Sequence, residues 1–325
     1  MNDIKHTPIM VKEIVSHVPE NCKLYVDGTA GHGWHIAAIT ASGKLAEDAH
    51  IVAIDRDGQM LAKAREILVS VMSRQKWSVM YVQDTYANIG SILKDMDPGS
   101  SPGWQSISPG WQSISPGWQG STKKIDFILL DIWVNMEHFK DGSRGFSIHE
   151  DAPLDMRFDT RSGETAGDIL NTYDKVELIR MFVQYGDFSP KSSEYFTDHI
   201  IENRKKEPFS TTKQFVDFLY GIWVRKNQLP IIFQCLRIQT NQELKQLEIF
   251  LQTFPDTIAV WGRCAIMTFH STEDRIVKYA FKALEEKWKF KLVNKKVIAP
   301  HYTEVQKNRA SRSAKLRIIE KVAKN

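Results

Sequence analysis

Apolar runs of strand length alternate with segments of helical periodicity through the first 140 residues of the chain. The strand-like runs are Lys23–Asp27, His50–Asp55, Trp77–Gln83 and Ile125–Ile132. The helix-like segments between them are Ile36–Ala46, Met60–Met72 and Ile89–Met96. This alternation predicts a parallel, doubly wound sheet, and the nearly continuous apolar run at Ile125–Ile132 is typical of a strand covered on both faces.

The pattern changes between about residues 141 and 225, where charged and aromatic residues are denser and no strong strand occurs. The two helices predicted there are Lys175–Gln184 and Lys191–Lys205. Alternation then resumes with a helix, a strand, a helix and a strand, at Phe233–Phe254, Cys264–Phe269, Glu273–Lys287 and Lys289–Val293. We therefore predict one α/β domain, formed by residues 1–140 and 226–325, that is interrupted by a helical insertion at 141–225.

Residues 101–119 are a perfect repeat of the seven-residue sequence SPGWQSI. Proline and glycine in every copy exclude a helix or an interior strand. Stacked tryptophans could bind a base or a partner, but a recent tandem duplication or an engineered linker is the favoured interpretation. We expect an exposed loop that precedes the Ile125–Ile132 strand.

The composition is that of an ordinary globular protein, since 42% of the 325 residues are hydrophobic and 25% are charged. No apolar run approaches the roughly 20 residues of a membrane-spanning helix, and the first ten residues lack the apolar core of a signal peptide. The three cysteines are widely spaced, and no Cys, His, Asp or Glu set has zinc spacing. We expect a cytoplasmic protein with reduced thiols, no metal site and no membrane partner.

The formal net charge of +4 is unevenly distributed. Residues 287–325 hold 12 Lys or Arg and 2 Asp or Glu, a net of +10, whereas the rest of the chain holds 31 basic and 37 acidic residues, a net of −6. A basic segment on an acidic body favours a polyanionic partner, and a solvated tail is the alternative. The residues predicted to contact phosphates are Arg309, Arg312, Lys315 and Arg317.

Candidate chemistry lies where the predicted strands end. A glycine-rich loop, Gly28-Thr-Ala-Gly31-His-Gly33, follows Asp27, and Asp55 and Asp131 end two further strands. Ligands of doubly wound sheets bind beyond the carboxyl ends of the strands, and an acid at the second strand can accept hydrogen bonds from ribose hydroxyls. A dinucleotide loop would need a third glycine where Ile36 stands, which disfavours a nicotinamide-dependent dehydrogenase.

An acid before the loop suits a ligand that carries an amine, and S-adenosylmethionine has both an amine and a sulfonium. A plain βα turn is the alternative for the loop, and a helix N-cap is the alternative for Asp131. Further along, Arg237, Asn241 and Leu244 have the spacing of residues that share one face of the predicted Phe233–Phe254 helix.

Several dense polar motifs make the sequence recognisable. They are HTPIMVKEIV, YVDGTAGHGWH, IVAIDRD, ILLDI, SRGFS, APLDMRFD, TAGDILN, TTKQFVDFL, FQCLRIQTNQEL, FHSTEDRIVK and NRASRSAKLR, in this order from His6 to Arg317. The chain resembles the bacterial 16S rRNA (cytosine-N4)-methyltransferase family over nearly its whole length. The resemblance implies a class I S-adenosylmethionine-dependent methyltransferase core, Rossmann-like and doubly wound, with an inserted all-helical domain for substrate recognition.

The resemblance also implies roles for single residues. S-adenosylmethionine contacts fall on Gly33, Trp34, His35, Asp55, Tyr86, Asp131 and His138. With Asp27 and Gly31 from the loop, these complete the predicted cofactor site, and Asp131 is the candidate acceptor for the amine proton of cytosine. The implied substrate is the decoding-site cytidine of 16S rRNA in the small ribosomal subunit, and the oligomeric state stays open, with a homodimer as one option.

Some positions depart from the family pattern. Trp34 stands where the family has glycine, and Tyr86 replaces phenylalanine. The family's D-L-G-V-S-S run appears as D-I-W-V-N-M at residues 131–136, which puts Trp133 at a glycine position and removes both serines. These changes favour the alternative function, a non-catalytic rRNA-binding or assembly protein on a decayed methyltransferase fold, whereas the intact acids oppose it.

Overall fold

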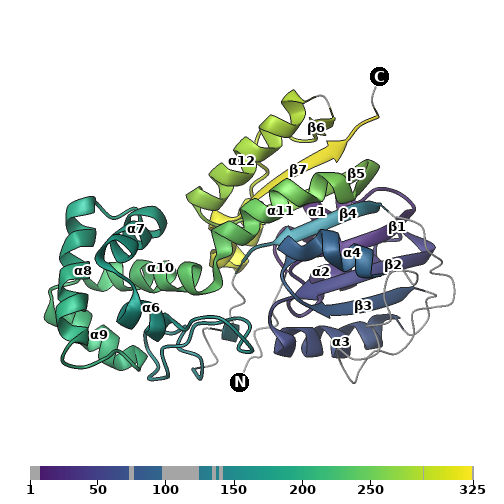
Figure 1. Cartoon of the computed structure of the whole chain (residues 1–325). Helices are drawn as coiled ribbons and strands as arrows, with labels where there is room; N and C mark the ends of the chain where they lie inside the picture. The colour runs from purple at the N-terminus through teal and green to yellow at the C-terminus, as the bar shows by residue number, and fades with distance from the viewer. Residues whose placement is uncertain are drawn as a thin grey trace. The chain divides into compact units, whose positions relative to one another are not determined.

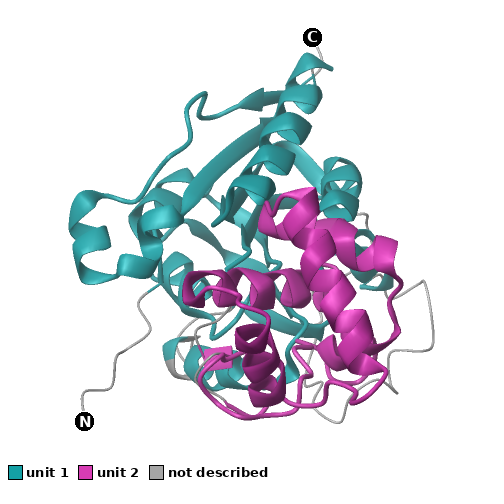
Figure 2. Ribbon diagram, turned by 90° about the vertical axis from the view of Figure 1, so that its left-hand side faces the viewer, with its two compact units in different colours: residues 1–133, 246–325 teal, residues 134–245 magenta. Residues whose placement is uncertain are grey.

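The computed structural model describes residues 8–72, 77–96, 124–133, 137–138, 142–287 and 289–323. The chain divides into two compact units, residues 1–133 with 246–325 (unit 1) and residues 134–245 (unit 2) (Figure 2). The SPGWQSI repeat at 101–119 and the replaced serine positions at 135 and 136 lie outside the described residues. Among the helices that are described, none is long and apolar enough to cross a membrane.

Unit 1 contains a seven-stranded sheet in the order β3-β2-β1-β4-β5-β7-β6 (Figure 1). The strands are β1 Cys22–Asp27, β2 Leu45–Asp55, β3 Ser78–Gln83, β4 Ile125–Asp131, β5 Ile258–Thr268, β6 Phe290–Leu292 and β7 Lys315–Lys321. The first five strands pair in parallel, and β7 is antiparallel to both β5 and β6. The carboxyl ends of β1 to β5 therefore meet at one edge of the sheet, as the alternating pattern predicts.

Helices cover both faces of this sheet. One face packs against α1 Val11–His17, α2 Trp34–Thr40 and α3 Gly58–Met72. The other packs against α4 Ile89–Asp95, α11 Glu243–Thr257 and α12 Ser271–Glu286 (Figure 1). Successive strand residues point to opposite faces, so Phe127 and Leu129 join the first core and Ile128 and Leu130 join the second, all four with no exposed surface. This double coverage explains the continuous apolar run of β4.

The basic segment is part of this sheet and not a solvated tail. It forms β6, α13 Tyr302–Lys307, the 3-10 helix η4 Arg309–Ser313 and β7. In β7, Leu316, Ile318 and Ile319 are fully buried, because the strand lies between β5 and β6. The sequence did not predict this strand, because Lys and Arg alternate with its apolar residues and the segment was interpreted by its charge.

Unit 2 is helical, as predicted. Its helices are α6 Ala166–Thr172, α7 Lys175–Gly186, α8 Pro190–Arg204, α9 Thr212–Gly221, the 3-10 helix η3 Lys226–Gln228 and α10 Leu229–Asn241. Thr165 and Asp174 open α6 and α7 with capping boxes, which satisfy the first backbone N–H groups of these helices. Aromatic rings fill much of the core, among them Phe182, Phe209 and Phe215.

Two expectations for this region differ from the structure. Unit 2 extends to Lys245 and not to residue 225, because α10 buries Leu229, Ile232 and Leu236 in the unit 2 core. The single helix expected at Phe233–Phe254 is two helices, α10 and α11, separated by Gln242 in the left-handed conformation (φ 49°). The prediction that Leu244 shares a helix face with Arg237 and Asn241 is therefore wrong.

Candidate functional site

The glycine loop between β1 and α2 is tied to the end of β2. Gly31 (φ 51°) and Gly33 (φ 78°) adopt the left-handed conformation that glycine tolerates best. The Gly31 N–H donates to Oδ2 of Asp55 at 2.8 Å. A side chain at Gly33 would also press on Ala64 and Leu68 of α3, with contacts of 3.3 Å. The loop conformation is thus set by its own glycines and by the acid at the end of the neighbouring strand.

Asp55 is oriented by backbone groups on both of its oxygens. Besides the bond from Gly31, Oδ1 accepts a hydrogen bond from the N–H of Asp57 at 2.9 Å. The place of Asp55 at the end of β2 is where ribose hydroxyls are held in doubly wound folds.

Asp27, at the end of β1, is a buried carboxyl with 1% of its surface exposed. The Tyr25 hydroxyl donates to it at 2.8 Å and the Thr29 N–H at 3.1 Å. Burial raises the pKa of Asp27 to about 6, although His35 and these hydrogen bonds oppose the shift. Its charge therefore changes just below neutral pH.

Asp131, at the end of β4, lies beside the same loop. Its N–H donates to the Thr29 hydroxyl at 2.7 Å, which fastens β4 to the glycine loop. Its carboxylate lies 3.7 Å from Nδ1 of His35 and accepts a bond from the Trp133 N–H at 3.2 Å. Burial, and to a lesser extent the charge of Glu273, raise the pKa of Asp131 to about 7, while the Trp133 bond lowers it. A carboxyl with this pKa can exchange a proton at neutral pH.

Aromatic residues stand close in sequence to the loop and to the strand ends. Tyr86 begins the 3-10 helix η1 (Tyr86–Asn88) after β3, and its ring meets Phe250 edge to face with centroids 5.7 Å apart. Gly28 permits this packing, because a side chain there would come within 2.9 Å of Cβ of Tyr86. Trp34 is the first residue of α2 and is partly buried. The Trp133 ring packs on Phe269, with centroids 4.3 Å apart.

The structure brings eight of the predicted cofactor residues into unit 1 at the carboxyl ends of its strands. They are Asp27, Gly31, Gly33, Trp34, His35, Asp55, Tyr86 and Asp131. The ninth, His138, belongs to unit 2, where it is 5% exposed and its ring lies 5.2 Å from that of Phe146 and 5.1 Å from that of Phe158.

Sequence reasoning missed the supporting residues of this site. Thr29 links the loop to β4, Tyr25 donates to Asp27, and Glu273 acts on the charge of Asp131. Thr29 could have been suspected from its place inside the glycine loop, but nothing in the spacing pointed to Glu273. That carboxylate is 3% exposed and accepts a hydrogen bond from the Phe269 N–H at 2.9 Å.

The four cations predicted to contact phosphate fall into two pairs. Arg309 and Arg312 lie exposed on η4. Arg317 on β7 donates twice to Asp274, at 2.7 and 3.2 Å, and Lys315 approaches the same carboxylate at 3.4 Å. Asp274 is partly buried, and although burial alone would raise its pKa, Arg317 and Lys315 lower it overall. Lys315 and Arg317 therefore already have an anionic partner within unit 1.

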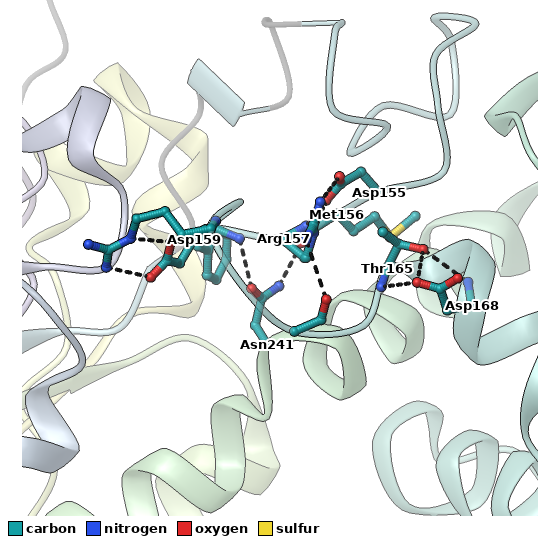
Figure 3. Close-up of polar contacts among 10 residues, drawn as sticks. Asp155, Met156, Arg157, Asp159, Thr165, Asp168 and Asn241 are labelled. Atoms are coloured by element: carbon teal, nitrogen blue, oxygen red, sulfur yellow. Dashed lines mark hydrogen bonds and ion pairs between the residues drawn. The ribbon is translucent and has the colours of Figure 1, made fainter.

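In unit 2, the APLDMRFD motif forms a tightly bonded segment (Figure 3). Asp155 accepts both the Nε and Nη2 groups of Arg157, and Asp159 does the same for Arg161. Asn241 at the end of α10 donates to the Met156 carbonyl at 2.7 Å and accepts from the Phe158 N–H at 2.8 Å. It thereby holds Met156 in the left-handed conformation (φ 58°), which is costly for a residue other than glycine.

The sheet order, with a parallel body and an antiparallel β7, and the acids around a glycine loop at the strand ends define a class I S-adenosylmethionine-dependent methyltransferase. The chain belongs to the MraW methylase family, whose profile matches residues 3–322. This confirms the fold and the enzyme class that the sequence motifs imply.

Relatives from several bacteria match over almost their full length, and each is named Ribosomal RNA small subunit methyltransferase H. The one from Elusimicrobium minutum is 33% identical, with 99% of this chain and 100% of the relative covered. The one from Leptospira interrogans is 34% identical, covering 97% and 89%. The one from Coprothermobacter proteolyticus is 31% identical, covering 98% and 97%.

The chemistry of the donor set fits S-adenosylmethionine, the cofactor of this class. Carboxyls with raised pKa values suit an amine, and the carboxylate of Asp55, placed at the end of β2, suits ribose hydroxyls. Tyr86, whose Cβ lies next to Gly28 of the loop, adds an aromatic ring to the set. Among the described residues, no group of three or more His, Cys, Asp or Glu is placed to hold a metal ion.

Proposed function

We propose that this enzyme methylates the exocyclic N4 of a cytidine in 16S rRNA of the small ribosomal subunit, at the decoding site. The observation that carries the proposal is Asp131, a carboxyl with a pKa of about 7 that is fastened by Thr29 to the glycine loop. The names of the full-length relatives support the substrate class.

The chemistry needs few groups from the protein. S-adenosylmethionine supplies an electrophilic methyl group on a good leaving group. The cytosine amine is a poor nucleophile because its lone pair is delocalised into the ring, so alignment and a proton acceptor matter most. Asp131 accepts the amine proton in its ionised form, and His35, 3.7 Å away, helps to hold the carboxylate in place.

We assign the remaining site residues as follows. Asp55 holds the ribose hydroxyls, Tyr86 the adenine, and Asp27 the amino group of the methionine part. Gly31 and Gly33 let the backbone approach the cofactor, next to Trp34 and His35. The assignment of His138 to the same cofactor is a separate proposal, because that residue belongs to unit 2.

For the rRNA we propose phosphate contacts by Arg309 and Arg312 first, since both are exposed on η4. Lys315 and Arg317 would contact a phosphate only while still bonded to Asp274 or after leaving that carboxylate. Unit 2 is proposed as the recognition domain. A small-subunit rRNA substrate also implies a cytoplasmic enzyme, and a homodimer remains one option for its assembly.

The test is transfer of a radiolabelled methyl group to small-subunit particles that lack this modification. We expect label in rRNA, recovered as N4-methylcytidine after digestion to nucleosides, and none with particles that already carry the modification. An enzyme that binds S-adenosylmethionine but labels no rRNA would overturn the proposal. That outcome would favour the non-catalytic alternative, to which Trp34 and Trp133 at family glycine positions already point.

A further inference from the structure

Helix α9 in unit 2 ends in an unusual way. The Val224 N–H donates to the Leu219 carbonyl at 3.0 Å, and the Trp223 N–H donates to the Tyr220 carbonyl at 3.0 Å. This pair of bonds is a Schellman motif, which places one residue after the helix in the left-handed conformation. Here that residue is Trp223, with φ 60°.

Glycine is the usual residue at this position, because a side chain in the left-handed conformation crowds the following carbonyl. A bulky residue there is an outlier. The strain is not offset by burial, because Trp223 is 88% exposed. A backbone outlier of this kind raises the question of a function, which the neighbouring side chains have to answer.

Other aromatic residues lie on the same elements. Tyr220, in the last turn of α9, is 47% exposed, and Tyr195 of α8 is 43% exposed. The Tyr195 hydroxyl donates to the Ile222 carbonyl at 3.3 Å, which places α8 beside the end of α9. The Tyr195 ring also contacts the His199 ring, with centroids 4.3 Å apart.

The charges at this surface favour a polyanion. Arg225 and Lys226 lie two and three residues after Trp223, and both are exposed. The acids nearest Tyr195 in the chain, Glu194 and Asp198, both form ion pairs with Lys175, at 3.0 and 2.7 Å, whereas Asp217, three residues before Tyr220 on α9, is a further exposed acid. Exposed aromatic rings next to exposed cations are the usual composition of a surface that binds unpaired nucleotides.

We propose that Trp223 stacks on an unpaired base of the substrate rRNA, with Tyr220 beside it and with Arg225 and Lys226 on the flanking phosphates. The proposal rests on the proposed rRNA methylation and adds to it a substrate contact in unit 2. It also explains why tryptophan stands where glycine would make α9 more stable.

The deciding variant is Trp223→Gly, in which stability and function should move in opposite directions. Removing the strain should raise the melting temperature by about 1–4 °C. Loss of one stacked base should raise KM for unmodified small-subunit particles by about 5-fold to 150-fold, with little change in kcat or in S-adenosylmethionine affinity. Trp223→Phe keeps an aromatic ring, so its KM should lie between that of Trp223→Gly and that of the wild-type enzyme.

Trp261 of β5 provides a matched control in unit 1, since it is also a tryptophan at positive φ (69°) and is 60% exposed. Trp261→Gly should relieve comparable strain without changing KM for the particles. An equal KM effect of both variants would overturn the proposal, as would an unchanged KM for Trp223→Gly in an enzyme that methylates normally. If the wild-type enzyme transfers no methyl group, the proposed function fails instead.

Binding to protein-free small-subunit rRNA fragments separates RNA from protein as the partner. We expect Trp223→Gly to weaken binding to these fragments. The salt dependence of the binding should hardly change, because stacking releases few counterions. Weaker binding to assembled particles with unchanged binding to the naked RNA would place a ribosomal protein on this surface and overturn the RNA assignment.

Discussion

Two pairs of carboxyls in the molecule contrast, Asp27 and Asp131 at strand ends of unit 1 and Asp155 and Asp274 in ion pairs with arginine. Asp27 and Asp131 have pKa values raised by burial, to about 6 and about 7. Asp155 and Asp274 are also partly buried, yet arginine partners lower their pKa values. Burial raises the pKa at all four carboxyls, but at Asp155 and Asp274 the burial is less complete and a fork of arginine hydrogen bonds replaces the lost water, so the net shift is downward.

The direction of the pKa shift separates carboxyls suited to a chemical role from carboxyls that stabilise the fold. A carboxyl that already has an arginine is stabilised as an anion and holds the chain in place, as Asp155 does for the segment drawn in Figure 3. A buried carboxyl with a raised pKa favours a cationic ligand or a proton, and this makes it a candidate for function. Changes in activity and in cofactor affinity test that division first, from the largest to the smallest, and a change in stability tests it last.

Asp131→Asn should have the largest effect. The amide keeps the size of the side chain but cannot accept the amine proton, so methyl transfer to small-subunit particles should fall by about 10²- to 10⁴-fold. Particle binding, measured by filter retention, should stay within about twofold. Methylation at the normal rate would show that Asp131 is not the proton acceptor.

Asp55→Ala should lower S-adenosylmethionine affinity by roughly 1.5–3 kcal/mol, about 10- to 150-fold, because charge-assisted hydrogen bonds to the ribose are lost. Isothermal titration calorimetry measures this directly. Since Asp55 also anchors Gly31, Asp55→Asn is the companion variant, and it should retain part of the affinity. An unchanged affinity in both variants would remove Asp55 from the cofactor site.

The affinity for S-adenosylmethionine should rise with pH. The amino group of the methionine part pairs with an ionised carboxylate, and Asp27 with a pKa of about 6 is mostly neutral at pH 5 and mostly ionised at pH 7. Titrations from pH 5 to pH 8 should therefore show about a tenfold gain, since only about a tenth of the carboxyl is ionised one pH unit below its pKa and nearly all of it two units above. Asp27→Asn should flatten the profile, and a profile that survives this change would contradict the assignment.

Asp274→Asn should leave the cofactor site alone and act on stability. Loss of the bidentate pair with Arg317 should reduce the free energy of unfolding by roughly 1–3 kcal/mol in urea titrations. Because the folded pKa of Asp274 is lowered, its contribution is present above the unfolded pKa of about 3.9 and is lost as pH falls through the folded pKa. Arg312→Gln is the matched control, since Arg312 is exposed on η4 and should change stability little.

The sequence predicted the parts of the fold that depend on local pattern. The alternation of apolar and amphipathic runs located β1 to β4 and the helices between them, and the acids Asp27, Asp55 and Asp131 lie at the strand ends as the pattern predicted. The motifs added the family. Each of these signals lies within a few consecutive residues.

The parts that were missed depend on partners far away in the chain. The bonds from Asn241 to Met156 and Phe158 join residues more than 80 positions apart. The alternation in β7 was masked by its charges, and only its pairing with β5 shows that Leu316 and Ile318 belong to the core. The break at Gln242 was equally hidden, since left-handed glutamine has no sequence signal comparable to glycine.

The position of β7 between β5 and β6 has a consequence for how the protein is made. Synthesis proceeds from the N-terminus, so β5 and β6 leave the ribosome before the strand that joins them. Until Lys315–Lys321 emerges, β5 has one row of unpaired backbone groups, and such an edge can pair with a neighbouring nascent chain. The late arrival of β7 makes it the step that closes the sheet, and prematurely terminated chains should be the ones that aggregate or are degraded.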